Sequence, residues 1–173
     1  MSEQQKDARH REKMKTVQAE HREKMKSKEK AEDGLLLVYT GNGKGKSTSA
    51  FGTVIRALGW GHSVAVVQYI KGTWKTGERE FFQRFEDLVT WHSMGEGFTW
   101  DTQDRQRDIA AAKAAWAKSR AFMESGGYDL VVLDEINIAL RYDQLEAAEV
   151  LADVPQPVGA GLLVLYGRPE QGA

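Results

Sequence analysis

Short apolar runs, separated by more polar stretches, dominate the chain from Gly34 onward. Five of these runs have the length and composition of β-strands. They cover Leu35–Thr40, Ser63–Ile70, Leu88–Ser93, Leu130–Asp134 and Gly161–Tyr166. All except the third are almost continuously apolar, which is typical of strands that are covered on both faces of a parallel sheet.

The stretches between these runs have the periodicity of helices. They are Ser47–Leu58, about Glu78–Phe85, Asp104–Glu124 and about Gln144–Ala152. In the third stretch, Ile109, Ala112, Trp116 and Met123 recur at helical spacing, and we expect them to face the core. Alternating strands and helices predict an α/β fold over residues 34–173, a doubly wound, mostly parallel sheet with helices on both faces. Ligands bind such sheets at the carboxyl ends of the strands.

The first 33 residues differ from the rest because they are highly charged and nearly devoid of large apolar side chains. They hold 10 Lys or Arg and 8 Asp or Glu residues, and the sequence His-Arg-Glu-Lys-Met-Lys occurs at His10–Lys15 and again at His21–Lys26. The repeat spacing of 11 residues is close to three helical turns, so a few apolar residues fall near one face. These are Met14, Val17 and Met25, together with His21. We expect a mobile, weakly amphipathic helix over residues 1–33, either a solvated tail or a segment that orders over a bound ligand.

Composition limits the classes of function. The formal net charge of the 173 residues is −1, which argues against a nucleic-acid partner. The absence of cysteine excludes disulfides, thiolate metal sites and a cysteine nucleophile. We expect a soluble cytoplasmic protein, since no apolar stretch is long enough for a membrane span and the N-terminus does not have the apolar core of a signal peptide.

The strongest motif is the turn that follows the first predicted strand, Thr40-Gly-Asn-Gly-Lys-Gly-Lys-Ser47. Between a strand and a helix, this order is that of a phosphate-binding P-loop, whose glycines let backbone N–H groups point at phosphate oxygens. Lys46 can reach the β- and γ-phosphates, Ser47 can bind Mg²⁺, and the helix N-terminus favours the same anion. The motif departs from the general pattern at Thr40, where a glycine is usual. The predicted nucleotide-binding residues are Gly41, Asn42, Gly43, Lys44, Gly45, Lys46, Ser47 and Thr48.

A second element is the acidic end of the strand Leu130–Asp134, where Asp134 is followed by Glu135. Carboxylates in this position lie near the nucleotide of a P-loop protein, and one of them can hold Mg²⁺ or Mn²⁺ directly or through water. The sequence does not say which of the two contacts the metal. In a hydrolase, Glu135 would be the candidate that activates water.

A third element is the glycine-preceded segment Gly95–Gln103, which contains Phe98 and Trp100. The two aromatic residues are two positions apart, so in an extended segment both project to one side. Such a pair can form a flat wall for a planar ligand, or it can pack into the core.

These elements and two further ones occur in an order that resembles the P-loop ATP:corrinoid adenosyltransferases, the cobalamin-adenosylating enzymes. The motifs that carry the resemblance are Thr40–Ser47, Gln68–Trp74, Gly77–Arg79, Gly97–Gln103 and Val132–Glu135. The similarity covers about residues 34–143 and, more loosely, the charged tail. A Gly-Asn-Gly-Lys-Gly-Lys loop together with a Gly-Phe-Thr-Trp segment is a specific combination.

The resemblance implies an enzyme that transfers the 5′-deoxyadenosyl group of ATP to the cobalt(I) of a reduced corrinoid and releases tripolyphosphate. It implies that Gly41–Ser47 bind the triphosphate and that Ser47 and Glu135 hold the divalent metal. The implied catalytic residues are Lys46, Glu135, Phe98 and Trp100. Phe98 and Trp100 would crowd the lower corrin face and disfavour the lower axial ligand of cobalt. It also implies a homodimer, an electron-donating flavoprotein and an N-terminal helix that closes over the site.

One feature departs from the family, and two other classes of function stay open. Relatives continue after the last strand with Thr-Gly-Arg-Gly, a helix and a final strand, whereas this sequence has Tyr166-Gly-Arg-Pro169 and stops at Ala173. We therefore expect a C-terminally short domain with an uncovered sheet edge.

The two alternative functions are another P-loop ATPase or kinase that uses Asp134 and Glu135, and a truncated relative that binds ATP or corrinoid without turnover.

Overall fold

The computed structural model describes residues 2–27, 35–41, 43–70, 75–93 and 104–154, together with the backbone of 162–166. Contacts divide the chain into two compact units, Met1–Ala31 and Glu32–Ala173.

The first unit is one helix, α1, which covers Glu3–Lys26 and contains no buried residue. Its N-terminus is closed by a capping box, in which Gln5 N donates to Ser2 Oγ at 3.3 Å and Ser2 N donates to Gln5 Oε1 at 2.9 Å. Three Lys–Glu pairs at i,i+3 spacing line its surface. The predicted helix is thus confirmed, and local interactions alone account for it.

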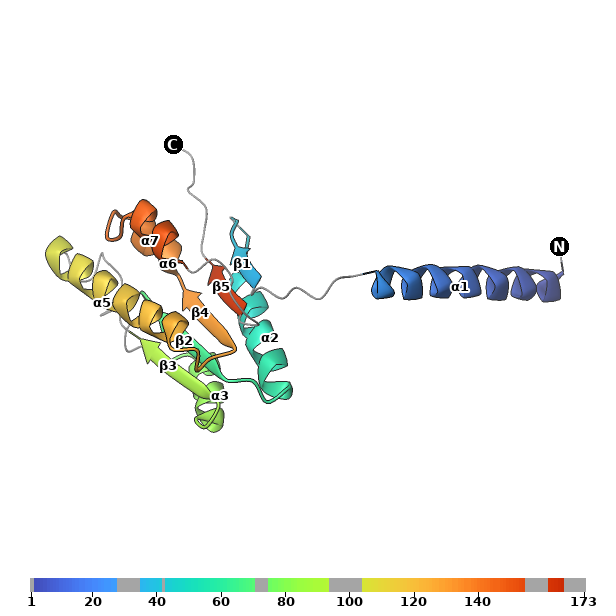
Figure 1. Ribbon diagram of the computed structural model, residues 1–173, viewed down its shortest axis with the longest axis horizontal. Helices are drawn as coiled ribbons and strands as arrows, with labels where there is room; N and C mark the ends of the chain where they lie inside the picture. The colour runs from blue at the N-terminus through green and yellow to red at the C-terminus, as the bar shows by residue number, and fades with distance from the viewer. Residues whose placement is uncertain are drawn as a thin grey trace. The chain divides into compact units, whose positions relative to one another are not determined.

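The second unit is built on a sheet of five parallel strands (Figure 1). The strands are β1 (Leu35–Tyr39), β2 (Val64–Gln68), β3 (Val89–Ser93), β4 (Leu130–Asp134) and β5 (Leu162–Tyr166). Their order across the sheet is β1-β5-β4-β2-β3. The predicted parallel α/β architecture is therefore confirmed.

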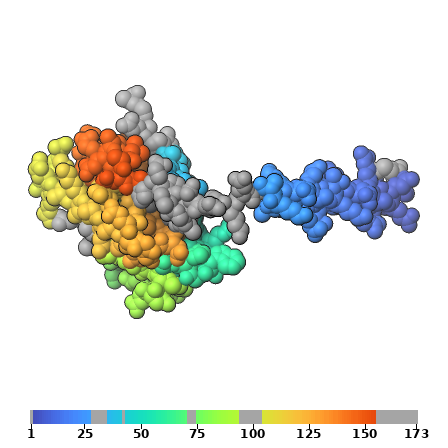
Figure 2. All heavy atoms as spheres, in the orientation of Figure 1, coloured from blue at the N-terminus to red at the C-terminus, as the bar shows by residue number. Residues whose placement is uncertain are grey.

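Helices pack on both faces of the sheet, and each face has its own apolar core. The helical segments are α2 (Lys46–Gly59), α3 (Gly77–Phe82), the 3₁₀ turn η1 (Gln83–Phe85), α5 (Arg105–Glu124), α6 (Ile136–Arg141) and α7 (Ala147–Asp153). One core combines α2 and α3 with one face of β2 and β4. The other combines α5, α6 and α7 with the opposite face. Figure 2 shows the heavy atoms of the same residues as spheres, with α5 (yellow) beside α7 (orange-red).

Two features of the fold differ from the prediction. The six-residue helix α6 was not expected, because it is too short to show helical periodicity. The strand β1 was expected to be covered on both faces, but Leu35, Leu36 and Val38 are 55%, 41% and 54% exposed. The reason is its position: among the described strands, β1 ends the strand order and is hydrogen-bonded to β5 alone, whereas β5 is bonded on both sides.

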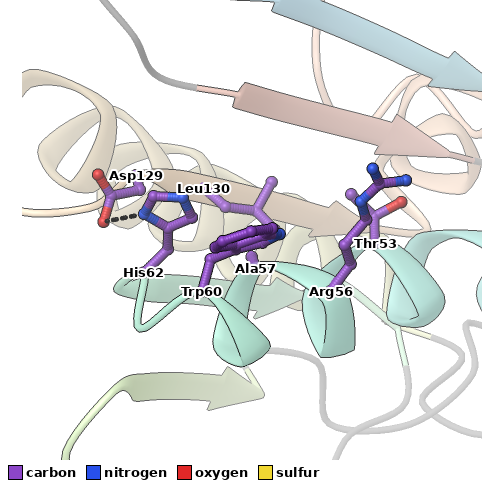
Figure 3. Close-up of a pocket in the computed structure, with 7 residues that line it drawn as sticks. All are labelled: Thr53, Arg56, Ala57, Trp60, His62, Asp129 and Leu130. Atoms are coloured by element: carbon purple, nitrogen blue, oxygen red, sulfur yellow. Dashed lines mark ion pairs between the residues drawn. The ribbon is translucent and has the colours of Figure 1, made fainter.

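The amino ends of β2 and β4 are joined by a compact group of hydrogen bonds. Asp129 Oδ2 accepts from Ser63 N at 2.8 Å and from Ser63 Oγ at 3.0 Å, and Asp129 N donates to Ser63 O at 2.9 Å. His62 Nδ1 lies 3.6 Å from the same carboxylate oxygen (Figure 3). The backbone hydrogen bond from Ser63 is the main reason why the pKa of Asp129 lies below its ordinary value.

We predict that Asp129→Ala lowers the free energy of unfolding by about 1 kcal/mol near neutral pH, a small effect because the carboxylate is half-exposed. Because the pKa of Asp129 is lower in the folded than in the unfolded protein, its carboxylate stabilises the folded state at pH values above the unfolded pKa of about 4. This stabilisation is lost as the pH falls through the folded-state pKa. Urea unfolding of wild type and Asp129→Ala at neutral and at acidic pH measures the difference in unfolding free energy, which should be smaller at acidic pH. Asp87→Ala, at an exposed turn carboxylate, is the control. A difference that is independent of pH would contradict the charge-dependent role.

Candidate nucleotide-binding site

All five strands end in one register row at the carboxyl edge of the sheet. The paired residues of this row are Tyr39, Tyr166, Asp134, Gln68 and Ser93, in strand order. The predicted P-loop follows Tyr39, and the predicted acidic pair ends β4. The structure therefore brings both elements to the same edge of the sheet, which is where open α/β sheets bind ligands.

The P-loop has the backbone that its glycines allow. Gly41 and Gly45 have φ values of 131° and 104°, which residues with a Cβ atom rarely adopt. Gly43 and Lys44 form the exposed bend between them, and the predicted Asn42 lies outside the described residues. The glycine positions thus fix the turn that the phosphate-binding motif requires.

The ammonium group of Lys46 lies inside the curve of this loop. Lys46 Nζ donates to the carbonyl oxygen of Gly41 at 2.7 Å and also to that of Gly43. The helix α2 begins at Lys46, and its N-cap, Gly45, supplies no side-chain cap. Its first N–H groups, which include those of the half-buried Ser47 and of Thr48, therefore need other acceptors. A positive side chain and uncapped helix N–H groups together suit a phosphate chain.

The acidic half of the site is more deeply buried. Asp134 is 0% exposed, and its Oδ2 accepts a hydrogen bond from Gln68 Nε2 at 2.8 Å. Glu135 is half-buried and has φ 67° and ψ 22°, a left-handed conformation that is uncommon for a residue with a side chain. It follows Asp134, the last residue of β4, and is the N-cap of α6, so the chain turns between strand and helix at this residue. Backbone conformations of this kind cluster at functional sites.

Three polar residues that the sequence did not single out for the site complete this half. Gln68 Oε1 accepts from Trp91 Nε1 and from Ser93 Oγ, both at 3.1 Å. Gln68 itself is 2% exposed. In the sequence, Gln68 stands at the end of an apolar strand and begins the motif Gln68–Trp74, but its partners become evident only from the sheet register.

The predicted aromatic pair, Phe98 and Trp100, lies outside the described residues. The described chain leaves the site at Ser93, the end of β3, and resumes at Asp104, which caps α5 by accepting from Gln106 N and Arg107 N at 3.1 and 3.2 Å.

Two hollows lie elsewhere on the described surface. One of about 250 Å³ adjoins Trp60, His62 and Asp129 at the amino ends of β2 and β4, opposite the P-loop edge (Figure 3). The other, of about 410 Å³, lies between α2 and α3 beside Phe51 and Phe81. Neither contains a residue of the P-loop or of the acidic pair.

Oxygen donors in the site suit a hard divalent cation. The described residues contain no group of three or more His, Cys, Asp or Glu side chains that could form a metal cage. Magnesium in nucleotide sites does not need one, because one or two carboxylates and the substrate phosphates suffice. The predicted donors Ser47, Asp134 and Glu135 are of that kind.

A glycine loop that leads into a helix, and a buried acidic strand end at the same edge of a parallel sheet, define a P-loop nucleotide-binding protein. The family model described as ATP:corrinoid adenosyltransferase BtuR/CobO/CobP matches residues 32–172. The chain belongs to this family, which confirms the resemblance carried by its motifs. Among the described residues, no helix is long and apolar enough to cross a membrane.

Three relatives support the same membership. A corrinoid adenosyltransferase from Pseudomonas aeruginosa is 53% identical over 167 residues, which are 96% of this chain and 82% of the relative. One from Sinorhizobium sp is 48% identical over 146 residues, 84% of this chain and 68% of the relative. The corrinoid adenosyltransferase CobA from Salmonella typhimurium is 43% identical over 137 residues, which are 79% of this chain and 69% of the relative.

We predict that Lys46→Ala weakens ATP binding by roughly 2–3 kcal/mol, because it removes a charge-assisted contact to the triphosphate. Isothermal titration with ATP and Mg²⁺ measures the loss. Lys113→Ala, on the exposed surface of α5, removes an equal charge away from the site and should leave the affinity unchanged. Equal affinities for wild type and Lys46→Ala would rule out the P-loop as the phosphate site.

Proposed function

We propose that this protein transfers the 5′-deoxyadenosyl group of ATP to the cobalt(I) of a reduced corrinoid and releases tripolyphosphate. The observation that carries the proposal is the family match over residues 32–172, which includes the P-loop, the acidic pair and the Phe98–Trp100 segment. The geometry of the described residues supports it, because Lys46 and Asp134 belong to the same edge of the sheet.

In this reaction the protein mainly has to position the two substrates and to stabilise the negative charge of the leaving group. Cobalt(I) is the nucleophile: its electron pair forms the bond to C5′ of the ribose, the C5′–O bond breaks, and that pair leaves on tripolyphosphate. The leaving group is a polyanion, so Lys46, Lys44 and the N–H groups of the loop stabilise the charge that develops. No proton is removed from the nucleophile, so the site needs no general base.

A divalent cation, Mg²⁺ or Mn²⁺, fits the oxygen donors of the site. Ser47, Glu135 and Asp134 would hold it, and the cation would supply additional neutralisation of the triphosphate. Glu135 follows the strand in a left-handed conformation, whereas the Asp134 carboxylate is held by a hydrogen bond from Gln68. We therefore assign the direct contact to Glu135 and a supporting role to Asp134.

The aromatic residues and the partners complete the proposal. Phe98 and Trp100 would face the lower side of the corrin and exclude the lower axial ligand, which makes cobalt(II) easier to reduce. An electron-donating flavoprotein would supply the electron. The enzyme would act as a homodimer, and the N-terminal helix α1 would close over the bound substrates. These assignments follow the family pattern and belong to the proposal.

An anaerobic assay tests the function. Protein, ATP, Mg²⁺ and chemically reduced cobalamin are mixed, and the absorption spectrum of the adenosylated product is followed together with the phosphate product. The proposal expects adenosylcobalamin and tripolyphosphate in equal amounts. Formation of ADP without adenosylcobalamin would instead identify a P-loop ATPase or kinase. Binding of ATP and corrinoid without turnover would identify a non-catalytic relative.

We predict that Glu135→Gln reduces the rate of adenosylation at least about tenfold while the protein stays folded, because a metal ligand loses its charge. Asp134→Asn is the comparison, since an asparagine can still accept the hydrogen bond from Gln68. Rates are measured over a range of Mg²⁺ concentrations, and far-ultraviolet circular dichroism monitors the fold. A loss confined to Asp134→Asn would assign the direct metal contact to Asp134.

We predict that Trp100→Ala lowers activity much more with a weak reductant than with chemically prepared cobalt(I). Removal of the ring would let the lower ligand return to cobalt(II), whereas cobalt(I) already lacks that ligand. Electron paramagnetic resonance of bound cobalt(II) would report the coordination number. A core-packing role for Trp100 instead predicts a stability loss of about 3–5 kcal/mol and equal damage in both assays.

A further inference from the structure

We propose that Gln68 is a positioning residue of the nucleotide site, which holds the Asp134 carboxylate in one orientation. The inference rests on the proposed role of the acidic pair in holding the metal–triphosphate complex. Gln68 is not required for the chemistry itself and acts only through Asp134.

The orientation of the Gln68 amide follows from its partners. An indole N–H can only donate a hydrogen bond, so the Gln68 atom 3.1 Å from Trp91 Nε1 is the amide oxygen. The amide nitrogen is then the atom 2.8 Å from Asp134 Oδ2. A flipped amide would place two donors together at Trp91 and two acceptors together at Asp134. Trp91 thereby determines that Gln68 presents a donor to the carboxylate.

Register and burial hold this arrangement rigidly. Gln68 is paired with Ser93 on one side and with Asp134 on the other, so the positions of these two neighbours are fixed by the backbone ladder. Gln68 and Asp134 are 2% and 0% exposed, and the Gln68–Asp134 hydrogen bond is therefore shielded from water. The Gln68 side chain is buried, and both its amide oxygen and its amide nitrogen are hydrogen-bonded, so it has little freedom to rotate.

The chain of contacts continues to the P-loop helix. The Trp91 ring stacks on Phe51 of α2 at 5.6 Å between ring centroids and on Phe82 of α3 at 5.8 Å, both at 25° between planes. α2 begins at the P-loop residue Lys46. Packing of the P-loop helix thus orients Trp91, Trp91 orients Gln68, and Gln68 orients Asp134.

The decisive quantity is the gain in ATP affinity that a metal confers, which is the affinity with saturating Mn²⁺ divided by the affinity in a chelator. It is measured by titration without corrinoid, and Mn²⁺ electron paramagnetic resonance reports the bound ion. We expect Gln68→Leu to reduce this gain about tenfold, because hydrogen-bonded groups in the outer shell of a metal site contribute to metal affinity on that scale. The affinity for ATP in the chelator should stay within about twofold of wild type, since no phosphate contact is removed.

The matched control is Tyr69→Phe. Tyr69 is the next residue along the chain, is 3% exposed and belongs to the core on the opposite face of the sheet, where its hydroxyl is 2.9 Å from Ser119 Oγ. This substitution also removes one buried hydrogen bond, so it should lower the melting temperature and leave the metal-linked gain at the wild-type value. If Gln68→Leu behaves in the same way, Gln68 is only a structural residue and the proposal is overturned.

A double-mutant cycle tests whether Gln68 acts through Asp134. In an Asp134→Ala background, Gln68→Leu should cause no further loss of the metal-linked gain, because the side-chain oxygens that it orients are gone. Losses that multiply would overturn the proposal. Should Gln68→Leu fail to fold, Trp91→Phe is the second variant, because it keeps an aromatic ring at this position and removes the N–H donor. We expect that change to reduce the gain about threefold, and an unchanged gain would count against the proposal.

Failure of this inference and failure of the proposed function give different results. If wild type makes adenosylcobalamin while Gln68→Leu keeps the full metal-linked gain, only the positioning role is wrong. If wild type makes no adenosylcobalamin but the Gln68→Leu variant has a reduced metal-linked gain in ATP affinity, the proposed function is wrong and the positioning role of Gln68 stands.

Discussion

The parallel register of the sheet is the constraint on which the candidate site depends. Because side chains alternate between the two faces of a strand, a slip of β4 by one residue would exchange Asp134 with Leu133. Asp134 would then lie in the core formed with α5, α6 and α7, away from Gln68. The hydrogen bonds between Ser63 and Asp129 hold the other end of β2 against β4. A polar contact at the amino edge of the sheet thus helps to preserve the geometry of a site at the carboxyl edge.

The site occupies the end of an otherwise apolar face. On the side of α2 and α3, β2 and β4 present Val64, Val66, Leu130 and Val132 before they reach the polar pair Gln68 and Asp134. A buried carboxylate in such a position is costly unless it is hydrogen-bonded. Gln68 provides that bond, and its own oxygen is satisfied by two donors. The stabilising apolar core and the polar site can therefore share one face without loss of packing.

The sequence predicted the parts of this protein that local pattern determines. The strands β2 and β4, the helix α5 and the P-loop lie within two residues of their predicted bounds, because apolar runs, helical spacing and glycines act over short distances. It could not predict the exposure of β1, which depends on a strand order that long-range pairing sets. It also gave no role to Gln68, because its partners Trp91 and Asp134 are 23 and 66 residues away along the chain.

The two halves of the site differ in how firmly the described structure holds them. The acidic half ends an interior strand, and Asp134 and Gln68 are almost fully buried. The phosphate half follows an edge strand whose outward side chains are exposed, and its bend at Lys44 is exposed as well. An enzyme that works by positioning needs at least one fixed reference for its substrate. In this fold the buried acidic strand end meets that requirement, since Asp134 is hydrogen-bonded to Gln68 and excluded from solvent.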